Sequence, residues 1–244
     1  MTDQKIVLIT GAGSGLGAEL SKAFAEKGFL VMGIGRSADK LAKAGESVEG
    51  HFEPYAADVA HAQEISKVID SIVEKHGKID IVFNNAAVYP KVNFVDESAE
   101  AFADALAINV NGVANVCKAV LPSMIANQYG RIFNVGSWAD IAPIAASAVY
   151  SASKGALHGL TKAIAADIQH LDLDIEIHEW IPGHMNTQMS EFTGMDPAIC
   201  ASWGVEIASR PNASKKNSIY EQNFEWQPPK GLKQKIKDKV LFWK

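Results

Sequence analysis

The stretch K-I-V-L-I-T-G-A-G-S-G-L-G, residues 5–17, decides the fold of this chain. Its apolar first half predicts a buried strand over residues 5–10, and the segment that follows predicts a helix over residues 16–27. In T-G-x-x-x-G-x-G the three glycines permit a tight turn, a close approach of the backbone to a pyrophosphate, and close packing of the helix on the strand. Free amides at the start of the helix would attract the anion. We therefore expect a dinucleotide-binding turn, the alternative being a glycine-rich turn without a ligand; its predicted contacts are Gly11, Ser14, Gly15, Leu16 and Gly17.

Strand-like and helix-like segments continue to alternate along the chain. Ile/Val-rich runs predict further strands, with Ser37 as a candidate helix N-cap and Gly77 as a candidate helix end. The predicted strands are residues 29–34, 51–56, 79–84, 131–135 and 174–181, and a helix is predicted at 60–76. Continuous apolar strands separated by amphipathic helices indicate a parallel sheet covered on both faces. The expected fold is α/β, a Rossmann-type doubly wound sheet forming a single domain over residues 1–244, with ligands beyond the carboxyl ends of its strands.

The composition argues against several classes of protein. A chain of 244 residues with 48% hydrophobic and 21% charged residues is typical of one soluble globular domain. Its net charge of −5 leaves no basic surplus for binding nucleic acid. The spacing of Cys117, Cys200 and the seven histidines matches neither a disulfide framework nor a metal site. We find no signal-peptide pattern and no run of about 18 apolar residues, so we expect a cytoplasmic protein without a membrane partner.

The residue after the second predicted strand bears on the choice of cofactor. An acidic residue there would accept hydrogen bonds from the ribose 2′-hydroxyl of NAD(H), but the chain has Gly35 followed by Arg36. A guanidinium group is suited to a 2′-phosphate. The sequence therefore favours NADP(H) over NAD(H), with Arg36 as the selecting residue. Asp39 is a rival ligand for the ribose, although the helix dipole also favours an acid in a first turn.

A second motif, Y-S-A-S-K at residues 150–154, carries the predicted chemistry. Tyr150 and Lys154 lie four residues apart, hence on one face of a helix, and Ser137 precedes the tyrosine by thirteen residues. Hydride delivery to a carbonyl carbon leaves an oxyanion that must be protonated, and a free tyrosine with a pKa of about 10 is a weak acid near neutrality. We expect the charge of Lys154 to lower the pKa of Tyr150, and Ser137 to hydrogen-bond the substrate oxygen.

Together these motifs resemble the short-chain dehydrogenase/reductase family, in its single-domain branch, over residues 5–190. Asn109, Ser137, Tyr150 and Lys154 match the catalytic tetrad of that family. The resemblance implies that Lys154 also binds the nicotinamide ribose, that Asn109 holds a water in a proton relay, and that the protein forms a homodimer or homotetramer. It also implies cofactor contacts from three further segments and from the catalytic helix: Asp58, Val59, Asn85, Ala86, Ala87, Tyr150, Lys154, Pro182, Gly183, Met185 and Thr187.

The chain departs from the family pattern near the expected site. Ala87 stands where the family has the glycine of N-N-A-G. His178, Glu179 and Trp180 are bulky and polar for the end of a buried strand, so either they line the substrate site or they pack structurally. His184 lies in the loop expected near the nicotinamide, and a plain loop histidine is the favoured interpretation.

The C-terminal part of the sequence departs further. Residues 184–215 are the expected substrate loop and helix, with the helix starting near M-D-P-A-I-C-A-S-W. The closing strand of the family, with its V-D-G-G-like end, is missing from the pattern. Residues 230–244 carry a charge of +5 and an apolar stripe at helical spacing. We expect this tail to pack on its own fold or on a subunit neighbour, the alternative being an anionic membrane surface.

These observations predict an NADP(H)-dependent oxidoreductase that moves a hydride between nicotinamide and a ketone or secondary alcohol, with Tyr150 as the acid/base. An NAD(H)-dependent alcohol dehydrogenase of the same family is the alternative. A non-catalytic NADP(H)-sensing protein is an alternative from another class, although a sensor has no need for Ser137, Tyr150 and Lys154 together. A sugar-nucleotide epimerase is disfavoured because the chain lacks the length for a separate substrate domain.

Overall fold

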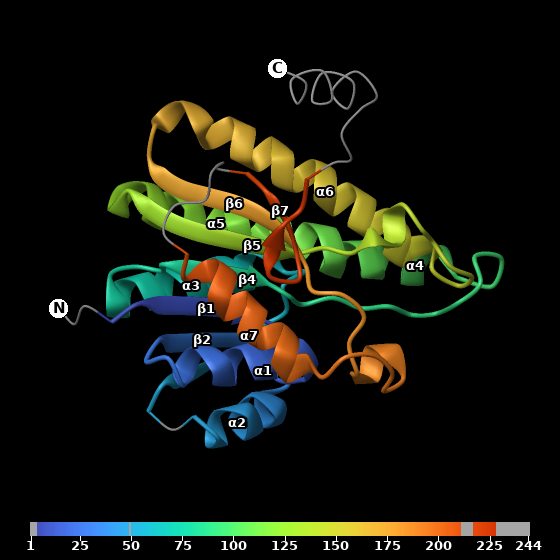
Figure 1. Cartoon of the computed structure of the whole chain (residues 1–244), viewed down its shortest axis with the longest axis horizontal. Coiled ribbons are helices and arrows are strands. Elements are labelled where there is room, and N and C mark those ends of the chain that lie inside the picture. The colour runs from blue at the N-terminus through green and yellow to red at the C-terminus, as the bar shows by residue number, and fades with distance from the viewer. Residues whose placement is uncertain (1–3, 49, 211–216, 228–244) are drawn as a thin grey trace, which may run out of the picture.

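A mostly parallel eight-stranded sheet with helices on both faces forms the centre of the molecule (Figure 1). The computed structural model describes residues 4–48, 50–210 and 217–227. The strand order is β3-β2-β1-β4-β5-β6-β7-β8, and only the pair β7–β8 is antiparallel. This order confirms the predicted doubly wound α/β fold. The strands are β1 (Ile6–Thr10), β2 (Leu30–Gly35), β3 (Phe52–Ala56), β4 (Ile81–Asn84), β5 (Tyr129–Val135), β6 (Asp174–Ile181), β7 (Ile219–Glu221) and β8 (Phe224–Glu225).

The helices form one layer on each face of the sheet. Those on the first face are α3 (Ala62–His76), α4 (Ala99–Leu106), the π-helix η1 (Ala107–Asn111), α5 (Gly112–Asn127) and α6 (Ala148–Ile168). Those on the second face are α1 (Gly15–Ala25), α2 (Ala38–Glu46) and α7 (Pro197–Ala208). Short 3-10 turns complete the structure: η2 (Trp138–Asp140), η3 (Gln169–Leu171) and η4 (Gln188–Ser190).

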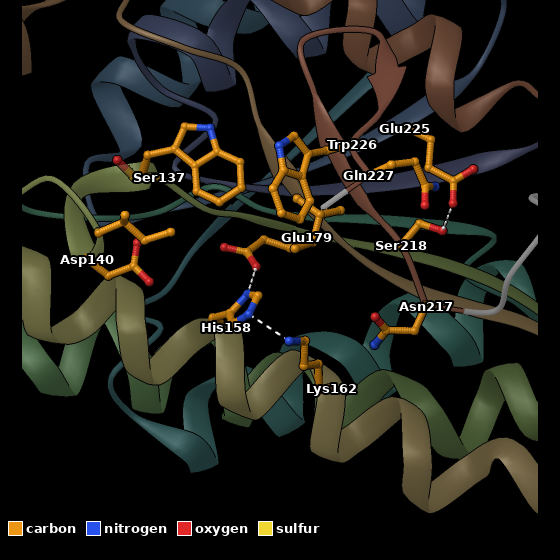
Figure 2. A pocket seen from close by; sticks show the side chains of 13 residues that line it. Ser137, Asp140, His158, Lys162, Glu179, Asn217, Ser218, Glu225, Trp226 and Gln227 are labelled. Atoms are coloured by element: carbon orange, nitrogen blue, oxygen red, sulfur yellow. Dashed lines mark hydrogen bonds and ion pairs between the residues drawn. The ribbon is translucent and has the colours of Figure 1, made fainter. Parts of the chain in front are cut away.

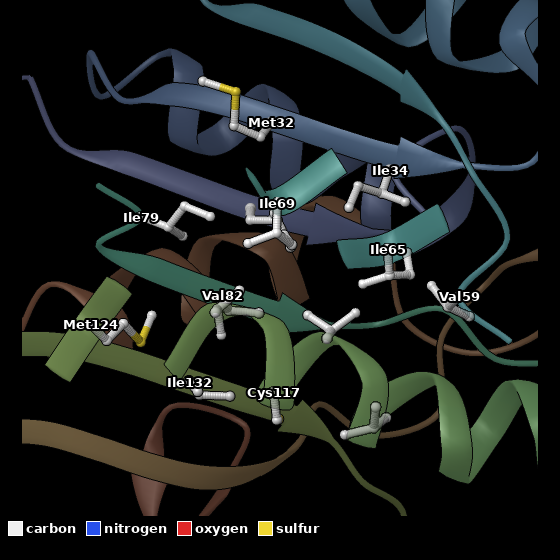
Figure 3. Close-up of a cluster of buried hydrophobic side chains, with 14 of the residues drawn as sticks. Met32, Ile34, Val59, Ile65, Ile69, Ile79, Val82, Cys117, Met124 and Ile132 are labelled. Atoms are coloured by element: carbon white, nitrogen blue, oxygen red, sulfur yellow. The ribbon is translucent and has the colours of Figure 1, made fainter. Parts of the chain in front are cut away.

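Side chains alternate between the two faces of the sheet along each strand, so the strands contribute to two hydrophobic cores. In β1, Ile6 and Leu8 lie in the core shared with α3 and α5, whereas Val7 and Ile9 lie in the core shared with α1 and α7. Figure 3 shows the first core, where side chains of the sheet face those of α3 and α5. Successive side chains of a strand point to opposite faces, so an unbroken apolar run is needed wherever both faces are covered.

Two of the predicted helix ends are confirmed at the level of hydrogen bonds. The Ser37 hydroxyl caps α2 by accepting from the amide of Lys40 at 3.3 Å. Gly77 ends α3 with a left-handed φ of 82°, and its amide donates to the Val73 carbonyl. The observed bounds of the strands and helices differ from the predicted ones by a residue or two.

The expectation that the closing strand is missing is wrong. Residues Ile219–Glu221 form β7, which pairs in parallel with Glu179–Ile181 of β6. The V-D-G-G-like end is replaced by a tight hairpin to β8, and a strand of three residues has too little periodicity to be recognised from sequence. The predicted helix before it is confirmed as α7, capped by Asp196. The tail at 230–244 lies outside the described residues.

The helical run Ala99–Asn127 is long and apolar enough, by length and composition, to cross a membrane. In the structure it is α4, η1 and α5, and Val113, Val116 and Val120 of α5 are buried in the first core. A core helix of a globular domain passes the same test of length and composition.

Candidate active site at the carboxyl edge of the sheet

The glycine turn between β1 and α1 has the backbone conformation of a phosphate-binding turn. Gly11 and Gly15 adopt left-handed φ values of 68° and 53°, which side-chain-bearing residues rarely adopt. A Cβ atom at Gly17 would lie 2.1 Å from the Gly11 carbonyl oxygen and 2.7 Å from Nδ2 of Asn85. The helix can therefore pack this closely on the turn only because Gly17 lacks a side chain, and a glycine turn of this kind fits a dinucleotide phosphate.

The start of α1 leaves backbone donors for such an anion. Ser14, at the N-cap, makes no side-chain cap bond, and the amide of Ala18 is the first that bonds back to the carbonyl of Ser14. The amides of Gly15, Leu16 and Gly17 thus lie in the first turn, where the helix dipole favours negative charge. Leu16 itself is buried in the second core.

The N-N-A-A segment after β4 is held beside this turn. The Thr10 hydroxyl accepts hydrogen bonds from the amides of Asn85 and Ala86, both at 3.0 Å, and Asn85 Nδ2 donates to the Thr10 carbonyl at 2.9 Å. On its other side, Val88 is bonded through its amide and carbonyl to the Asn109 side chain. Ala87 lies between these two anchored positions and is half-buried.

The loop after β6 reaches the same turn from the opposite direction. A Cβ atom at Gly15 would lie 3.4 Å from Cγ2 of Thr187. Gly183, directly after Pro182, has a φ of 98°, and Met185 forms a parallel bridge with Met195 that folds the loop back on itself. The P-G-x-x-x-T-like segment and the glycine turn are therefore neighbours.

The part of the site that is predicted to bind the adenosine of the cofactor lies beside the start of α2. Arg36 is exposed at the carboxyl end of β2. A Cβ atom at Gly13 would lie 2.9 Å from Cβ of Lys40, so Lys40 adjoins the glycine turn. Asp58 Oδ1 accepts from the amide of Ala60, and Val59 is buried. Sequence reasoning overlooked Lys40, although its place one turn after Arg36 on an N-capped helix was a usable signal.

Three of the four predicted catalytic residues meet at the carboxyl ends of β5 and β6. The Ser137 side chain hydrogen-bonds the Tyr150 hydroxyl. Lys154 is 4% exposed, its Nζ donates to the Val135 carbonyl at 2.6 Å, and it lies 5.4 Å from the centroid of the Tyr150 ring. The Ser137 oxygen also accepts from the Ala139 amide at 3.2 Å, which leaves its hydroxyl proton free to be donated.

The pKa of Tyr150 is shifted in the direction opposite to that expected from the sequence. Burial raises the pKa of its phenol, the hydrogen bond with Ser137 opposes that rise, and Tyr89 adds to it. The prediction that Lys154 lowers this pKa is wrong here: the ammonium group bonds the Val135 carbonyl and lies over the Tyr150 ring, and burial of the phenol raises the pKa. Burial also lowers the pKa of Lys154, to about 8. Tyr150 is thus a protonated phenol at neutral pH.

Asn109 occupies a distorted turn of helix. It lies in the π-helix η1, a rare i→i+5 geometry that is often found at functional sites. Its side chain bonds Val88 twice and the Ser153 hydroxyl at 3.1 Å. Asn109 is therefore tied to the residue preceding Lys154, and it contacts the catalytic group through Ser153.

Two contacts at the mouth of the site were missed by sequence reasoning. The ring of Tyr89 stacks on Tyr150, with ring centroids 4.6 Å apart and planes 20° apart. Lys91 Nζ lies 2.6 Å from the Glu191 carboxylate, which joins the loop after β4 to the loop after β6. Both contacts connect residues that are distant in sequence, so no local sequence pattern predicts them.

The bulky residues at the end of β6 have two different roles: two pack in the core and one lines a cavity. His178 and Trp180 are fully buried and pack structurally, against Phe133 and Phe83 respectively. Glu179 faces the other side of the sheet and lines a cavity beside Ser137. His184 lies in the exposed loop, where its Nε2 contacts Thr193 Oγ1 at 2.9 Å.

Comparison with known proteins agrees with this arrangement. A family model described as short chain dehydrogenase matches residues 5–197. The 3-oxoacyl-[acyl-carrier-protein] reductase FabG of Thermotoga maritima is 33% identical over 190 residues, which cover 77% of this chain and 76% of that protein.

Solved structures share the fold at lower identity. A 3-ketoacyl-(acyl-carrier-protein) reductase from Brucella melitensis, complexed with NADH, has a TM-score of 0.81 at 24% identity, covering 89% of this chain and 96% of that one. A metagenomic short-chain oxidoreductase in complex with NADP has a TM-score of 0.78 at 23% identity, covering 90% and 98%. Because the family model matches residues 5–197, which are most of this chain, the chain belongs to the short-chain dehydrogenase/reductase family of oxidoreductases.

Proposed function

We propose that this protein is an NADP(H)-dependent oxidoreductase that interconverts a ketone and a secondary alcohol, with Tyr150 as the acid/base. The observation that carries the proposal is the meeting of Ser137, Tyr150 and Lys154 at the sheet edge that also bears the glycine turn. An NADP(H)-sensing protein would need only the turn. Catalytic turnover of any carbonyl therefore separates the two functions.

The side chains support this chemistry as follows. When bound, nicotinamide supplies a hydride to the substrate carbon or accepts one from it. Tyr150, kept protonated by burial, donates its proton to the substrate oxygen during reduction and takes it back during oxidation. Ser137 donates a hydrogen bond to the same oxygen and so holds it within reach of the tyrosine. Lys154 would hold the nicotinamide ribose through its ammonium group.

The rim of the site favours an apolar substrate. Large hydrophobic side chains are exposed on the three loops that follow β4, β5 and β6: Phe94 at 69%, Ile141 and Ile144 at 71%, and Phe192 at 71%. These loops follow the carboxyl ends of parallel strands, where ligands of such folds bind, and exposed apolar groups are typical of ligand-binding surfaces. We therefore expect ketones with aromatic or long alkyl substituents to react faster than small polar keto acids.

A substrate panel tests this function. Purified protein is incubated with NADPH or NADH and with aliphatic ketones, aryl ketones, aldehydes and keto acids, and the absorbance of the reduced nicotinamide is followed. We expect NADPH oxidation with the apolar ketones. Binding of NADPH without turnover of any carbonyl in either direction would favour the sensing function instead.

Arg36→Ala is expected to weaken NADPH binding by about 1.5–3 kcal/mol, because a hydrogen bond between a guanidinium group and a phosphate is lost. NADH lacks the 2′-phosphate, so its dissociation constant should change little. Fluorescence titration of both cofactors measures the difference. Lys43→Ala, which removes a positive charge from the exposed part of α2, is the matched control. Equal losses for both cofactors would favour the NAD(H)-dependent alternative.

The proposed enzyme acts in the cytoplasm as a homodimer or homotetramer. Light scattering coupled to gel filtration gives the mass of the assembly, and a monomer at micromolar concentration would contradict this part of the proposal.

A further inference from the structure

Glu179 is a buried carboxylate to which the proposed reaction assigns no role. Its residue is 3% exposed, and its side chain points from β6 toward α6 (Figure 2). A buried carboxylate remains ionised only where hydrogen bonds and opposite charges replace its lost hydration. Burial raises the pKa of Glu179, and the hydrogen bond from His158 is the largest effect that opposes this rise.

A chain of hydrogen bonds leads from this carboxylate to the surface. His158 Nδ1 lies 2.6 Å from Glu179 Oε2, and Lys162 Nζ lies 2.7 Å from His158 Nε2. An ammonium group can only donate, so Nε2 accepts from Lys162, and the imidazole proton is on Nδ1, from which it is donated to Glu179. His158 and Lys162 lie one turn apart on α6 (Figure 2), and the order of donors stabilises an ionised Glu179.

The second oxygen of the Glu179 carboxylate, Oε1, adjoins the catalytic centre. A Cβ atom at Gly136 would lie 2.2 Å from Glu179 Oε1, so the carboxylate rests on the backbone directly before Ser137. That same backbone holds Lys154, whose Nζ donates to the carbonyl of Val135. The charges of Glu179 and Lys154 attract each other: Glu179 is the group that opposes the effect of burial on the pKa of Lys154.

Other ionisable groups also face Glu179 or its cavity. Asp140 of η2 raises the pKa of Glu179 by repulsion, whereas His158 and Lys154 of α6 lower it. Glu225 of β8 lines the same cavity of about 380 Å³, and Trp138 and Trp226 are also among its lining residues. The cavity is open to solvent, so the chain of hydrogen bonds ends where protons can exchange with water.

We propose that Glu179, held ionised by His158 and Lys162, is a positioning residue that keeps the catalytic Lys154 in its ammonium form. The role of Lys154 in this statement rests on the proposed function. The hydrogen-bond acceptor that the structure describes for the Lys154 ammonium group is the Val135 carbonyl, which is neutral. A buried ammonium group without a nearby anion loses its proton readily.

Glu179→Gln tests the proposal because it removes the charge but keeps an oxygen that can accept from His158. The ammonium form of Lys154 is present below its pKa of about 8 and is lost as the pH rises through that value. Removal of the anion that raises this pKa should move the loss to lower pH, by about one unit. We expect the alkaline limb of the pH profile of kcat/KM to shift down by the same amount.

Variants of His158 separate an electrostatic role from a merely structural one. His158→Leu removes the donor that keeps Glu179 ionised, so the alkaline limb should shift in the same direction as in Glu179→Gln, but less. His158→Gln retains an amide donor and should restore the wild-type profile. Glu225→Gln removes a different carboxylate from the same cavity and should leave the profile unchanged.

NMR titration of lysine-labelled, cofactor-free protein measures the ionisation of Lys154 without any turnover, with its signal assigned from Lys154→Met. A midpoint about one unit lower in Glu179→Gln than in wild type supports the proposal. Superimposable titrations and pH profiles would overturn it. If no variant turns over any substrate, the proposed function fails, and the NMR titration still decides the role of Glu179.

Discussion

Tyr150→Phe is expected to lower kcat/KM by about 10²–10⁴-fold, the contribution typical of a general acid. The substitution removes the only atom that would exchange a proton with the substrate oxygen, together with the hydrogen bond to Ser137. The phenyl ring keeps its stacking on Tyr89 and its contact with Lys154. Steady-state kinetics with NADPH and the best substrate of the panel measure the loss.

Unchanged cofactor affinity and melting temperature are the controls for this variant. Both are expected because the ring fills the same volume and the phosphate cradle is formed by other residues. A rate above half that of the wild type would show that Tyr150 is not the acid. Ser137→Ala complements the test: it should also reduce kcat, because the substrate oxygen loses a hydrogen-bond donor.

Gly17→Ala is expected to lower the free energy of unfolding by about 1–3 kcal/mol or more and to abolish NADPH binding. The added Cβ atom would lie 2.1 Å from the Gly11 carbonyl oxygen and 2.7 Å from the carbonyl carbon of the same residue. Both are backbone atoms of the turn, so neither can rotate away as a flexible side chain would. The start of α1 must move away from the turn, and the amides that face the phosphate move with it.

Gly159→Ala provides the matched control for this steric argument. Gly159 lies within α6, and among the described residues no heavy atom outside the neighbouring backbone of that helix lies within 4 Å of a Cβ placed there. Alanine is the better helix former, so this variant should gain about 0.5–1 kcal/mol and bind NADPH normally. Chemical denaturation and cofactor titration compare the two. If Gly17→Ala matched Gly159→Ala in both measurements, the proposed cradle would be wrong.

The sequence by itself determined the elements whose signals are local. Strand β1 and helix α1 follow from an apolar run and a glycine turn, and the ends of α2 and α3 follow from a hydroxyl cap and a glycine with positive φ. The approach of Tyr150 to Lys154 also follows from local spacing, because residues four apart share one face of a helix. In each case the residues that carry the signal lie within one turn or one strand of each other.

The tertiary structure decided what depends on contacts between distant segments. Strand β7 exists because Ile219–Glu221 pair with β6, and three residues have no periodicity of their own. The pKa of Tyr150 rises because surrounding side chains bury its phenol, which the local spacing of Tyr150 and Lys154 could not predict. Glu179 meets His158 across 21 residues of chain and Tyr89 meets Tyr150 across two loops. Burial and charge pairing act through space, so the site's electrostatics emerge only once the strands and helices have packed together.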